Sequence, residues 1–303
     1  MKEIVKIWLE SAYGVFPGAG GVKNTGYVVV ELNKANSYTV RPKPIQKTIR
    51  TSSGLNRVSK LFSSQTGLSG NLSTYLYAEQ SAFFLNGLLN ISGGDLPSYT
   101  IDHYILREDT SGTVDYTRHL GVKFGSGSLT CSSDDPIAKL SFGVIGQKPV
   151  GITATDFPVP IGTEFPNSRP YLHTDLGTGG LILGGSRNNY SSFTFECKNI
   201  LDTPFFESQY IGRNVFRGRD ISLNAEMLYQ VSSDRAAFES TTQQTASAVF
   251  NGTPTTTFNL GVASYLTAVE DGLDFGKVYR QTLSYVNTID LLGTGTDFSY
   301  TVV

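Results

Sequence analysis

The stretch Ser192-Phe193-Thr194-Phe195-Glu196-Cys197 alternates polar and apolar side chains along its whole length. Successive side chains of a β-strand point to opposite faces, so this pattern predicts a strand with one buried and one solvated face. The same alternation recurs in residues 140–144, 221–227 and 297–302, and residues 26–32 form an apolar run typical of a strand covered on both faces. The chain is therefore predicted to be mainly β.

The composition narrows the class of protein further. The chain has 303 residues, only 17% of them charged, and is rich in Gly, Tyr and Phe, which is unlike a helical bundle. Two cysteines exclude a disulfide framework, and a net charge of −2 argues against a basic nucleic-acid binder. No apolar stretch is long enough for a membrane helix, so we expect no membrane partner. Acidic residues flank the short apolar run near the N-terminus, so we expect no signal peptide. The protein is then expected to be made and kept in a reducing cytoplasm.

Two segments have the periodicity of a helix rather than that of a strand. In residues 78–89, apolar side chains recur at spacings of four, three and four, which places them on one helical face. Residues 234–250 show a weaker pattern of the same kind, with Ser233 as the cap and Asn251-Gly252 as the stop. The sequence thus predicts one helix in each half of the chain.

The predicted elements occur twice in the same order: a strand, a long loop, a strand, a helix and three further strands. The first copy begins with the strand 27–32 and the loop 33–56, and the second begins with the strand 191–197 and the loop 198–215. Prolines cluster between the copies, at Pro149, Pro158, Pro160, Pro166 and Pro170. We therefore predict an N-terminal β domain over residues 1–150, a linker over 151–168 and a C-terminal β domain over 169–303.

Residues suited to catalysis are few. The histidines, His103, His119 and His173, have no second histidine or cysteine at metal-ligand spacing. Cys131 and Cys197 lie one in each half, and we expect both to be free thiols, buried or half-buried. A glycoside hydrolase would need two facing carboxylates, and no spacing indicates such a pair. We therefore predict no catalytic residue, no metal site, no cofactor and no enzymatic activity.

Residues 40–60 stand out because they contain several basic residues and no acidic one. The basic residues are Arg41, Lys43, Lys47, Arg50, Arg57 and Lys60. Pro42 and Pro44 exclude a helix, so the stretch is predicted to be an extended arm within the long loop. Three interpretations are open: contact with nucleic acid, a solvated loop, or an arm that docks on an acidic patch of a neighbouring subunit.

Several motifs resemble those of the tail tube proteins, or major tail proteins, of long-tailed bacteriophages. The N-terminal half carries Trp8-Leu9-Glu10-Ser11-Ala12-Tyr13-Gly14-Val15, then Arg41-Pro42-Lys43-Pro44, Arg50-Thr51 and the strand-to-helix block 68–89. The C-terminal half carries Arg217-Gly218-Arg219-Asp220-Ile221-Ser222-Leu223, Asp271-Gly272 and the final strand 295–302. The resemblance covers most of the chain and points to a two-domain, duplicated member of the family.

This resemblance implies a fold and a function. Each tube domain of the family is a small β-sandwich or partly rolled barrel with one flanking α-helix, and six domains close a ring whose inner strands line a channel. A chain with two tandem domains is then expected to form a homotrimeric ring with pseudo-six-fold symmetry. Stacked rings would form the hollow tail tube around a tape-measure protein, next to tail-end proteins. DNA would later pass through a weakly acidic lumen without specific binding, into the host.

The resemblance also suggests roles for individual residues. The basic residues of the 40–60 stretch, and Arg213 in the corresponding loop of the second half, are expected at the contacts between rings. Trp8 and Tyr13 lie in an N-terminal arm that is expected to brace a neighbouring subunit, although burial of Trp8 in its own core is an equally good interpretation. The protein is expected in the virion, after assembly in the host cytoplasm.

Two other functions stay open on the sequence alone. A β-sandwich carbohydrate- or receptor-binding virion protein would gather its tyrosines on one face, whereas here the 16 Tyr are scattered along the chain. A ring-forming tube protein of a contractile tail or an injection machine is the closer alternative, although the doubled chain argues against its single-domain forms. The sequence leaves undecided which residues face the lumen and whether a ring holds three or six chains.

Overall fold

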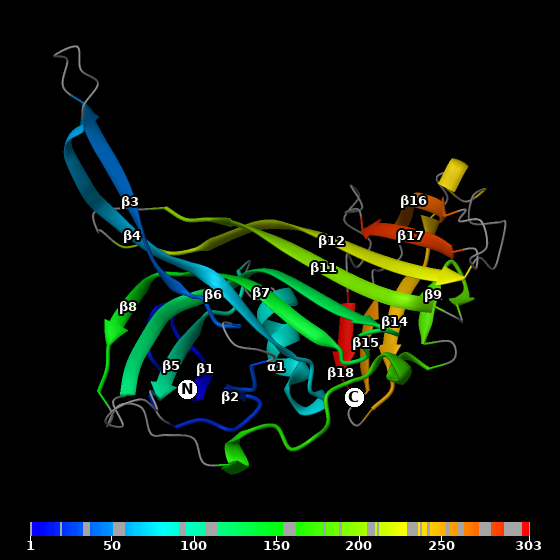
Figure 1. Cartoon of the computed structure of the whole chain (residues 1–303), viewed down its shortest axis with the longest axis horizontal. Coiled ribbons are helices and arrows are strands. Elements are labelled where there is room, and N and C mark those ends of the chain that lie inside the picture. The colour runs from blue at the N-terminus through cyan, green and yellow to red at the C-terminus, as the bar shows by residue number, and fades with distance from the viewer. Residues whose placement is uncertain are drawn as a thin grey trace.

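The computed structural model confirms a mainly β protein (Figure 1). It describes residues 2–18, 20–32, 37–50, 58–90, 95–106, 114–153, 162–177, 180–187, 190–204, 210, 212–228, 236, 238–240, 243–252, 255–259, 264–272, 280–287 and 299–302. No helix within these ranges is long and apolar enough to cross a membrane.

Most described strands belong to one large, antiparallel sheet. From the N-terminal half it takes β1 (Lys2–Leu9), β2 (Tyr27–Val30), β3 (Arg41–Arg50), β4 (Val58–Tyr75), β5 (Tyr99–Leu106), β6 (Val114–Ser132), β7 (Lys139–Gly146) and β8 (Lys148–Gly151). From the C-terminal half it takes β11 (Tyr190–Asp202), β12 (Val215–Leu228), β13 (Gln243–Gln244), β16 (Ser264–Gly272) and β17 (Arg280–Asn287). The sheet therefore runs through both halves of the chain.

A smaller sheet covers part of the large one. It consists of β10 (Ser186–Arg187), β9 (Leu181–Leu183), β14 (Ala246–Phe250), β15 (Thr256–Asn259) and β18 (Ser299–Val302), in that order. Two short 3₁₀ helices, η1 (Gly162–Glu164) and η2 (His173–Leu176), lie between the halves of the sequence. Phe250 of the small sheet meets Phe193 of the large one, with ring centroids 6.0 Å apart, so the C-terminal half is a sandwich of two sheets.

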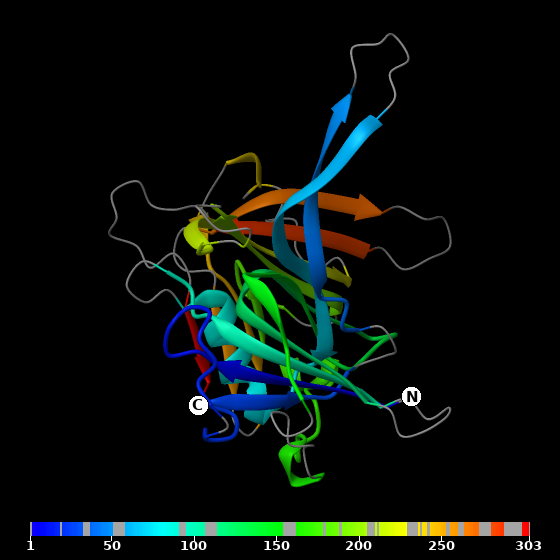
Figure 2. The same cartoon turned by 90° about the vertical axis from the view of Figure 1, so that its left-hand side faces the viewer.

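The long strand β6 gives the N-terminal half its partly rolled shape. Its first part pairs with β5, while its last part pairs with β7 over residues 123–130 and with β11 over residues 126–132. Because one strand serves two groups of neighbours, the sheet curls around the helix α1 (Ala78–Leu89), as Figures 1 and 2 show. The β6–β11 pair joins the two halves of the chain in one sheet.

One cluster of buried side chains extends through both halves. Under α1, the rings of Phe84, Phe124 and Phe142 stack, with the last two centroids 4.4 Å apart. The helix approaches β6 closely at Gly87, where a Cβ atom would lie 2.5 Å from the Phe124 ring. Glycine is therefore required at this point of contact between helix and sheet.

Several predicted elements agree with the structure. The first helix has the predicted bounds, Ala78–Leu89, and β5 spans the predicted strand, Tyr99–Leu106. Val28, Val29 and Val30 of β2 are all buried, which confirms a strand covered on both faces.

The second predicted helix, over residues 234–250, is wrong in its C-terminal half. Residues 243–244 and 246–250 are the strands β13 and β14, and a helical hydrogen bond occurs only earlier, from Ser240 N to Ala236 O among the described residues. Ala246, Ala248 and Phe250 are buried while the residues between them are half-buried, which is a period of two. Pairing of β14 with β9 and β15 therefore outweighs the helical spacing.

The two predicted long loops are shorter than expected. Residues 41–50 form β3, and β11 continues past residue 198 to Asp202. Pro42 and Pro44 did not prevent a strand because β3 pairs on one side only among the described strands, with β4. The N–H of Thr39 bonds to Asn71 O of β4, so the N positions of residues 42 and 44 face away from β4.

Candidate assembly surfaces

The basic stretch forms a hairpin that projects from the body of the molecule (Figures 1 and 2). Arg41 and Lys43 lie exposed near the base of β3. Lys47 and Arg50 follow farther along β3, and Lys60 lies on β4 opposite Ile49. Arg57 lies outside the described residues. The structure thus places five of the predicted contact residues on one projecting hairpin.

The face of the large sheet that points away from α1 is called here the open face. Its central row crosses six neighbouring strands, with Ser73, Ser141, Ser128, Glu196, Ser222 and Val286 in register. The next row has Lys139, Thr130, Thr194, Asn224 and Ser284. Serine, threonine and asparagine therefore dominate this face.

The open face is hollowed along its middle. A shallow groove of about 920 Å³ is lined mainly by serine and glycine of β4, β6 and β7, among them Ser126, Ser141 and Gly143. The part of the lining that the structure describes contains no tyrosine or tryptophan. Phe142 lies in the lining but is buried, so this part of the groove offers no exposed aromatic platform on which ligands stack.

Charged residues on the open face are few and of mixed sign. On β7, β11 and β12, Glu196, Asp220 and Glu226 are acidic, and Lys139 and Lys198 are basic. Arg41 and Lys43 lie on the same face at the β3 edge. Lys198 stands opposite Asp220 in the β11–β12 register. Lys139 forms an ion pair with Asp135. On β7, β11 and β12 the open face therefore carries a small negative balance, whereas its β3 edge is basic.

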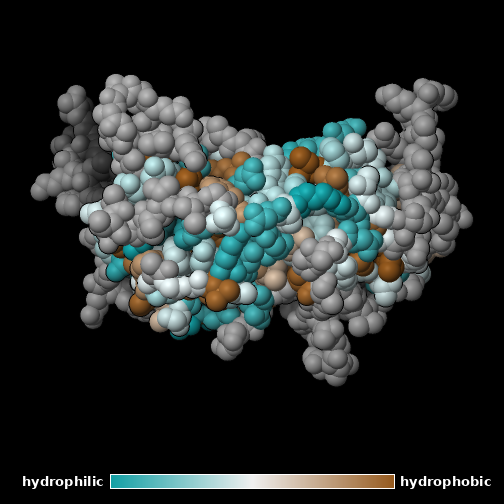
Figure 3. Space-filling view, turned by 90° about the horizontal axis from the view of Figure 1, so that it is seen from below, coloured by the Kyte–Doolittle hydropathy of each residue, from teal (hydrophilic) through white to brown (hydrophobic). Residues whose placement is uncertain are grey.

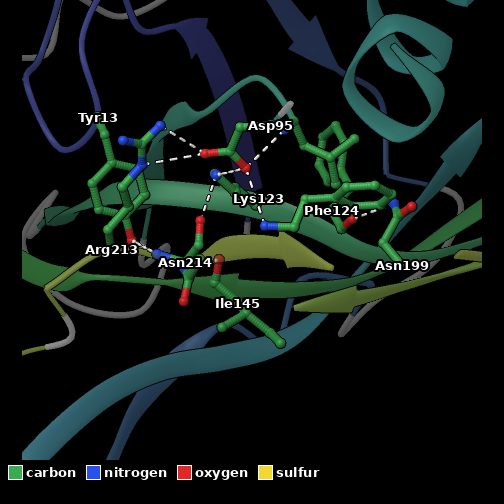
Figure 4. Close-up of polar contacts among 10 residues, drawn as sticks. Tyr13, Asp95, Lys123, Phe124, Ile145, Asn199, Arg213 and Asn214 are labelled. Carbon is green, nitrogen blue, oxygen red and sulfur yellow. Dashed lines mark hydrogen bonds and ion pairs between the residues drawn. The ribbon is translucent and has the colours of Figure 1, made fainter. Parts of the chain in front are cut away.

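Arg213 is held by an ionic network within its own chain, shown in Figure 4. Its guanidinium lies 2.9 Å from an oxygen of Asp95, whose other oxygen lies 2.6 Å from Nζ of Lys123. Lys123 Nζ also donates to Asn214 O at 2.5 Å, and Asn214 N donates to the Tyr13 hydroxyl at 3.2 Å. The network holds the loop that precedes β12 against β6 and against the N-terminal arm.

Burial and charge act in opposite directions on this network. Burial alone would raise the pKa of Asp95, but hydrogen bonds from Lys123 and its charge outweigh burial and hold that pKa below its ordinary value. Burial lowers the pKa of Lys123, and Asp95 opposes this change. The Lys123 side chain is 1% exposed, whereas that of Arg213 is 59% exposed. Lys123 is therefore the member that depends most on its partners.

Trp8 lies in the core of its own chain. It is buried on β1, and its Nε1 donates to Asp102 Oδ2 at 3.2 Å. Arg118 binds both oxygens of Asp102, at 2.7 and 2.8 Å, and covers the ring of Phe16. The structure thus uses Trp8 to anchor the N-terminal arm, of which Tyr13 is a part.

The histidines and cysteines make structural contacts. His119 Nδ1 lies 2.5 Å from the Tyr38 hydroxyl, and His103 Nε2 lies 2.6 Å from Glu3 Oε1. Cys131 and Cys197 are free and buried, as predicted, and burial raises the pKa of each thiol to about 12. Among the described residues, no three His, Cys, Asp or Glu side chains are grouped to hold a metal ion.

The underside of the molecule differs from the open face. Figure 3 shows hydrophobic residues there in small groups between hydrophilic ones. The large apolar residues that are most exposed among the described ones are Leu9, Val15, Val22, Ile200 and Phe238. Three of these five lie in the N-terminal segment, which fits a surface that another protein covers.

A comparison with known families decides which protein class this architecture belongs to. The sequence model of the phage tail tube protein family matches residues 5–297 of the chain. The chain belongs to the phage tail tube protein family. No curated protein matches it significantly. Membership implies a structural role in the tail tube, assembly with copies of itself into that tube, and a place in the tail of the virion.

Sequence reasoning missed the open face and the partners of Arg213. The open face had a signal: serine and threonine occupy the outward phase of β6, β7, β11 and β12, opposite the buried phase. No sequence signal pointed to Asp95 and Lys123 as partners, because each is far from Arg213 in sequence and the network depends on how the sheet folds.

Proposed function

We propose that copies of this chain close into rings, that the rings stack into the hollow tube of a phage tail, and that DNA passes through this tube into the host. Family membership supports the tube. The open face of the large sheet carries the rest of the proposal, because a conduit needs a wall to which DNA does not bind. The hydroxyl side chains that dominate this face carry no charge, so DNA that slides past them releases few counterions and gains little binding energy.

The charge of the open face supports the same assignment. On β7, β11 and β12 its acidic residues outnumber its basic ones, and Lys198 stands opposite Asp220 in register. A small negative balance repels phosphate rather than binding it. We therefore assign the open face to the lumen of the tube.

We further propose a homotrimeric ring with pseudo-six-fold symmetry. Two units of four neighbouring strands follow each other in the large sheet, first β3-β4-β7-β6 and then β11-β12-β17-β16. These units would form the lumen-facing sheets of an N-terminal domain over residues 1–150 and a C-terminal domain over 169–303, with 151–168 as the linker. Three chains then supply six units to one ring.

The projecting hairpin is suited to contact the next ring of the stack. β4 pairs with β7 only from Leu68 to Tyr75, so the rest of the β3–β4 hairpin, with Lys47, Arg50 and Lys60, extends beyond the sheet. We propose these three residues and Arg57 as contacts with the next ring. We propose Arg213 as a second inter-ring contact, because its guanidinium is largely exposed. Trp8 and Tyr13 would act by holding the N-terminal arm against a neighbouring subunit.

The remaining partners follow from the place in the virion. We propose that the tube assembles in the host cytoplasm around a tape-measure protein and contacts tail-end proteins at its ends. DNA passes without specific binding, and the chain has no enzymatic activity.

Electron microscopy of the purified, concentrated chain tests this function. We expect rings or hollow tubes, with three-fold symmetry in averaged end views. High salt should separate stacked rings, because basic residues mediate the proposed inter-ring contacts. Monomers at every concentration and salt would contradict the proposal.

A further inference from the structure

The two four-strand units of the large sheet match residue by residue. In the first unit, Tyr38, Leu72 and Phe142 stand side by side in register. In the second unit, Phe193, Ala225 and Leu283 do the same. All six are buried. The match shows that β3 and the residues before it correspond to β11, β4 to β12, and β7 to β17.

The outermost strands of the units correspond in the same way. Ser128 of β6 stands opposite Ser141 of β7, and Glu270 of β16 stands opposite Thr282 of β17. β6 is therefore the last strand of the first unit, and β16 is the last strand of the second. Within the chain, the last strand of the first unit pairs with the first strand of the second, through β6 and β11.

With this internal junction, the row formed by the two units has one outer strand at each end, β3 and β16. Among the described strands, β3 pairs with β4 alone. β16 pairs with β17, and on its other edge the residues that the structure describes cover only Ser264 and Tyr265, through β13. Open strand edges favour pairing with another chain.

We infer that the β16 edge of one copy pairs with the β3 edge of the next, in the register of the β6–β11 junction. In that junction Glu196 stands opposite Ser128. The corresponding residues are Arg41 on β3 and Glu270 on β16, so these two stand opposite each other across the contact. The inference rests on the proposed function, because repeated head-to-tail pairing is what closes a ring.

The charges on the two strand edges favour this pairing over a chance contact between strand edges. Arg41 and Lys43 are exposed, and the strand that would meet them carries Glu270 and Asp271. Opposite charges in direct cross-strand register stabilise a pair of strands, and like charges would destabilise two β3 edges that met each other. Arg41 and Lys43, at the base of the hairpin, thus meet an acidic strand of the neighbouring copy within the same ring. Only the tip of the hairpin reaches the next ring.

The backbone geometry fixes the type of pair and the length of the contact. Thr39 N bonds to β4, and Arg41 has the same phase, so Arg41 and Glu270 form a non-hydrogen-bonded pair with Cα atoms about 4.5 Å apart. Pro42 and Pro44 offer no N–H at the open edge. The two prolines remove two successive outward donors from β3, which favours pairing at the base of the hairpin, before Pro42.

Disulfide trapping tests the register. The distance of a non-hydrogen-bonded pair suits a disulfide. We expect the double variant Arg41→Cys, Glu270→Cys to form covalent dimers and trimers on a non-reducing gel after mild oxidation. Each single variant should stay monomeric on the gel, because Cys131 and Cys197 are buried. The matched control is Arg41→Cys, Glu226→Cys, in which the second cysteine replaces an acid on the inner strand β12.

Charge reversal gives an independent readout. Arg41→Glu or Glu270→Arg alone should weaken ring formation about fivefold per contact, and the two together should restore it. Tubes in the microscope without cross-links between positions 41 and 270 would overturn the edge pairing and leave the tube function standing. Cross-linked trimers that never stack would support the edge pairing and count against the tube. Absence of both would contradict both.

Discussion

At the scale of single residues, Lys123 shows how much a buried charge depends on its partners. Replacing it with methionine removes the cation that neutralises Asp95 and the donor to Asn214 O. The change takes this donor from Asn214 O and the buried cation from Asp95, which keeps the exposed Arg213 as a cationic partner. We therefore expect Lys123→Met to lower the free energy of unfolding by about 3 kcal/mol.

Urea unfolding measures this loss, and Arg213→Met is the matched control. Arg213 contacts the same carboxylate from the solvent side, and an exposed ion pair is worth less than about 1 kcal/mol. Equal losses for the two variants would show that burial does not govern this network.

His119 makes stability depend on pH. Burial lowers its pKa in the folded chain to about 4, against about 6.5 in an unfolded chain. The unfolded state therefore binds the proton more tightly, and stability falls as the pH drops from about 6.5 to 4, by at most about 3 kcal/mol. Thermal unfolding at pH 7 and pH 4.5 should show this loss in the wild type and a smaller one in His119→Gln. A pH dependence unchanged in the variant would contradict the assignment.

At the scale of elements, α1 depends on the close approach of Gly87 to β6. An alanine would bring Cβ within 2.5 Å of the Phe124 ring and 2.7 Å of the Tyr99 hydroxyl. Alanine favours a helix over glycine by about 1 kcal/mol, yet we expect Gly87→Ala to destabilise by about 1–3 kcal/mol because the stacked rings cannot move apart. Thermal unfolding tests this, with the exposed neighbour variant Asn86→Ala as control. A stabilised Gly87→Ala variant would refute the close-packing argument.

Pro42 and Pro44 protect the open edge of β3. Replacing both with threonine restores two N–H donors, so we expect strand edges to pair out of register and irregular aggregates to form. Light scattering during concentration should rise for this double variant and not for Pro97→Thr, which changes a proline outside the strands. Regular tubes with unchanged scattering would show that the prolines do not limit pairing.

The elements also show how far the sequence alone could go. Local patterns predicted α1 and β5 because their buried residues recur with one clear period. β14 was missed because its alternation lies within a stretch that also fits a helix, and its pairing with β9 and β15 decides between them. The strand β3 was missed because prolines forbid a central strand but not an edge strand, and edge position is a property of the whole sheet. Likewise, Arg213 was selected from its loop, but its partner Asp95 comes from a distant segment.

At the scale of the whole molecule, both halves of the chain contribute strands to one continuous wall. Ser128 and Ser141 on the open face lie on neighbouring strands and face each other in register. If this face lines the lumen, changing both to lysine adds twelve cations per pair of stacked trimeric rings, and phosphate contacts then release counterions. We expect tubes of this double variant to retain labelled DNA at low salt and to lose it steeply as salt rises.

The control places the same charge elsewhere. Val22→Lys adds a cation at a position that is 71% exposed in the N-terminal segment, far from the open face in the fold. Tubes of the wild type and of Val22→Lys should retain little DNA at any salt, since the lumen of both keeps its hydroxyl wall. If Val22→Lys retained DNA and the Ser128→Lys, Ser141→Lys tubes did not, the open face would lie outside the tube. The wall that DNA passes would then be the underside, with its scattered apolar residues.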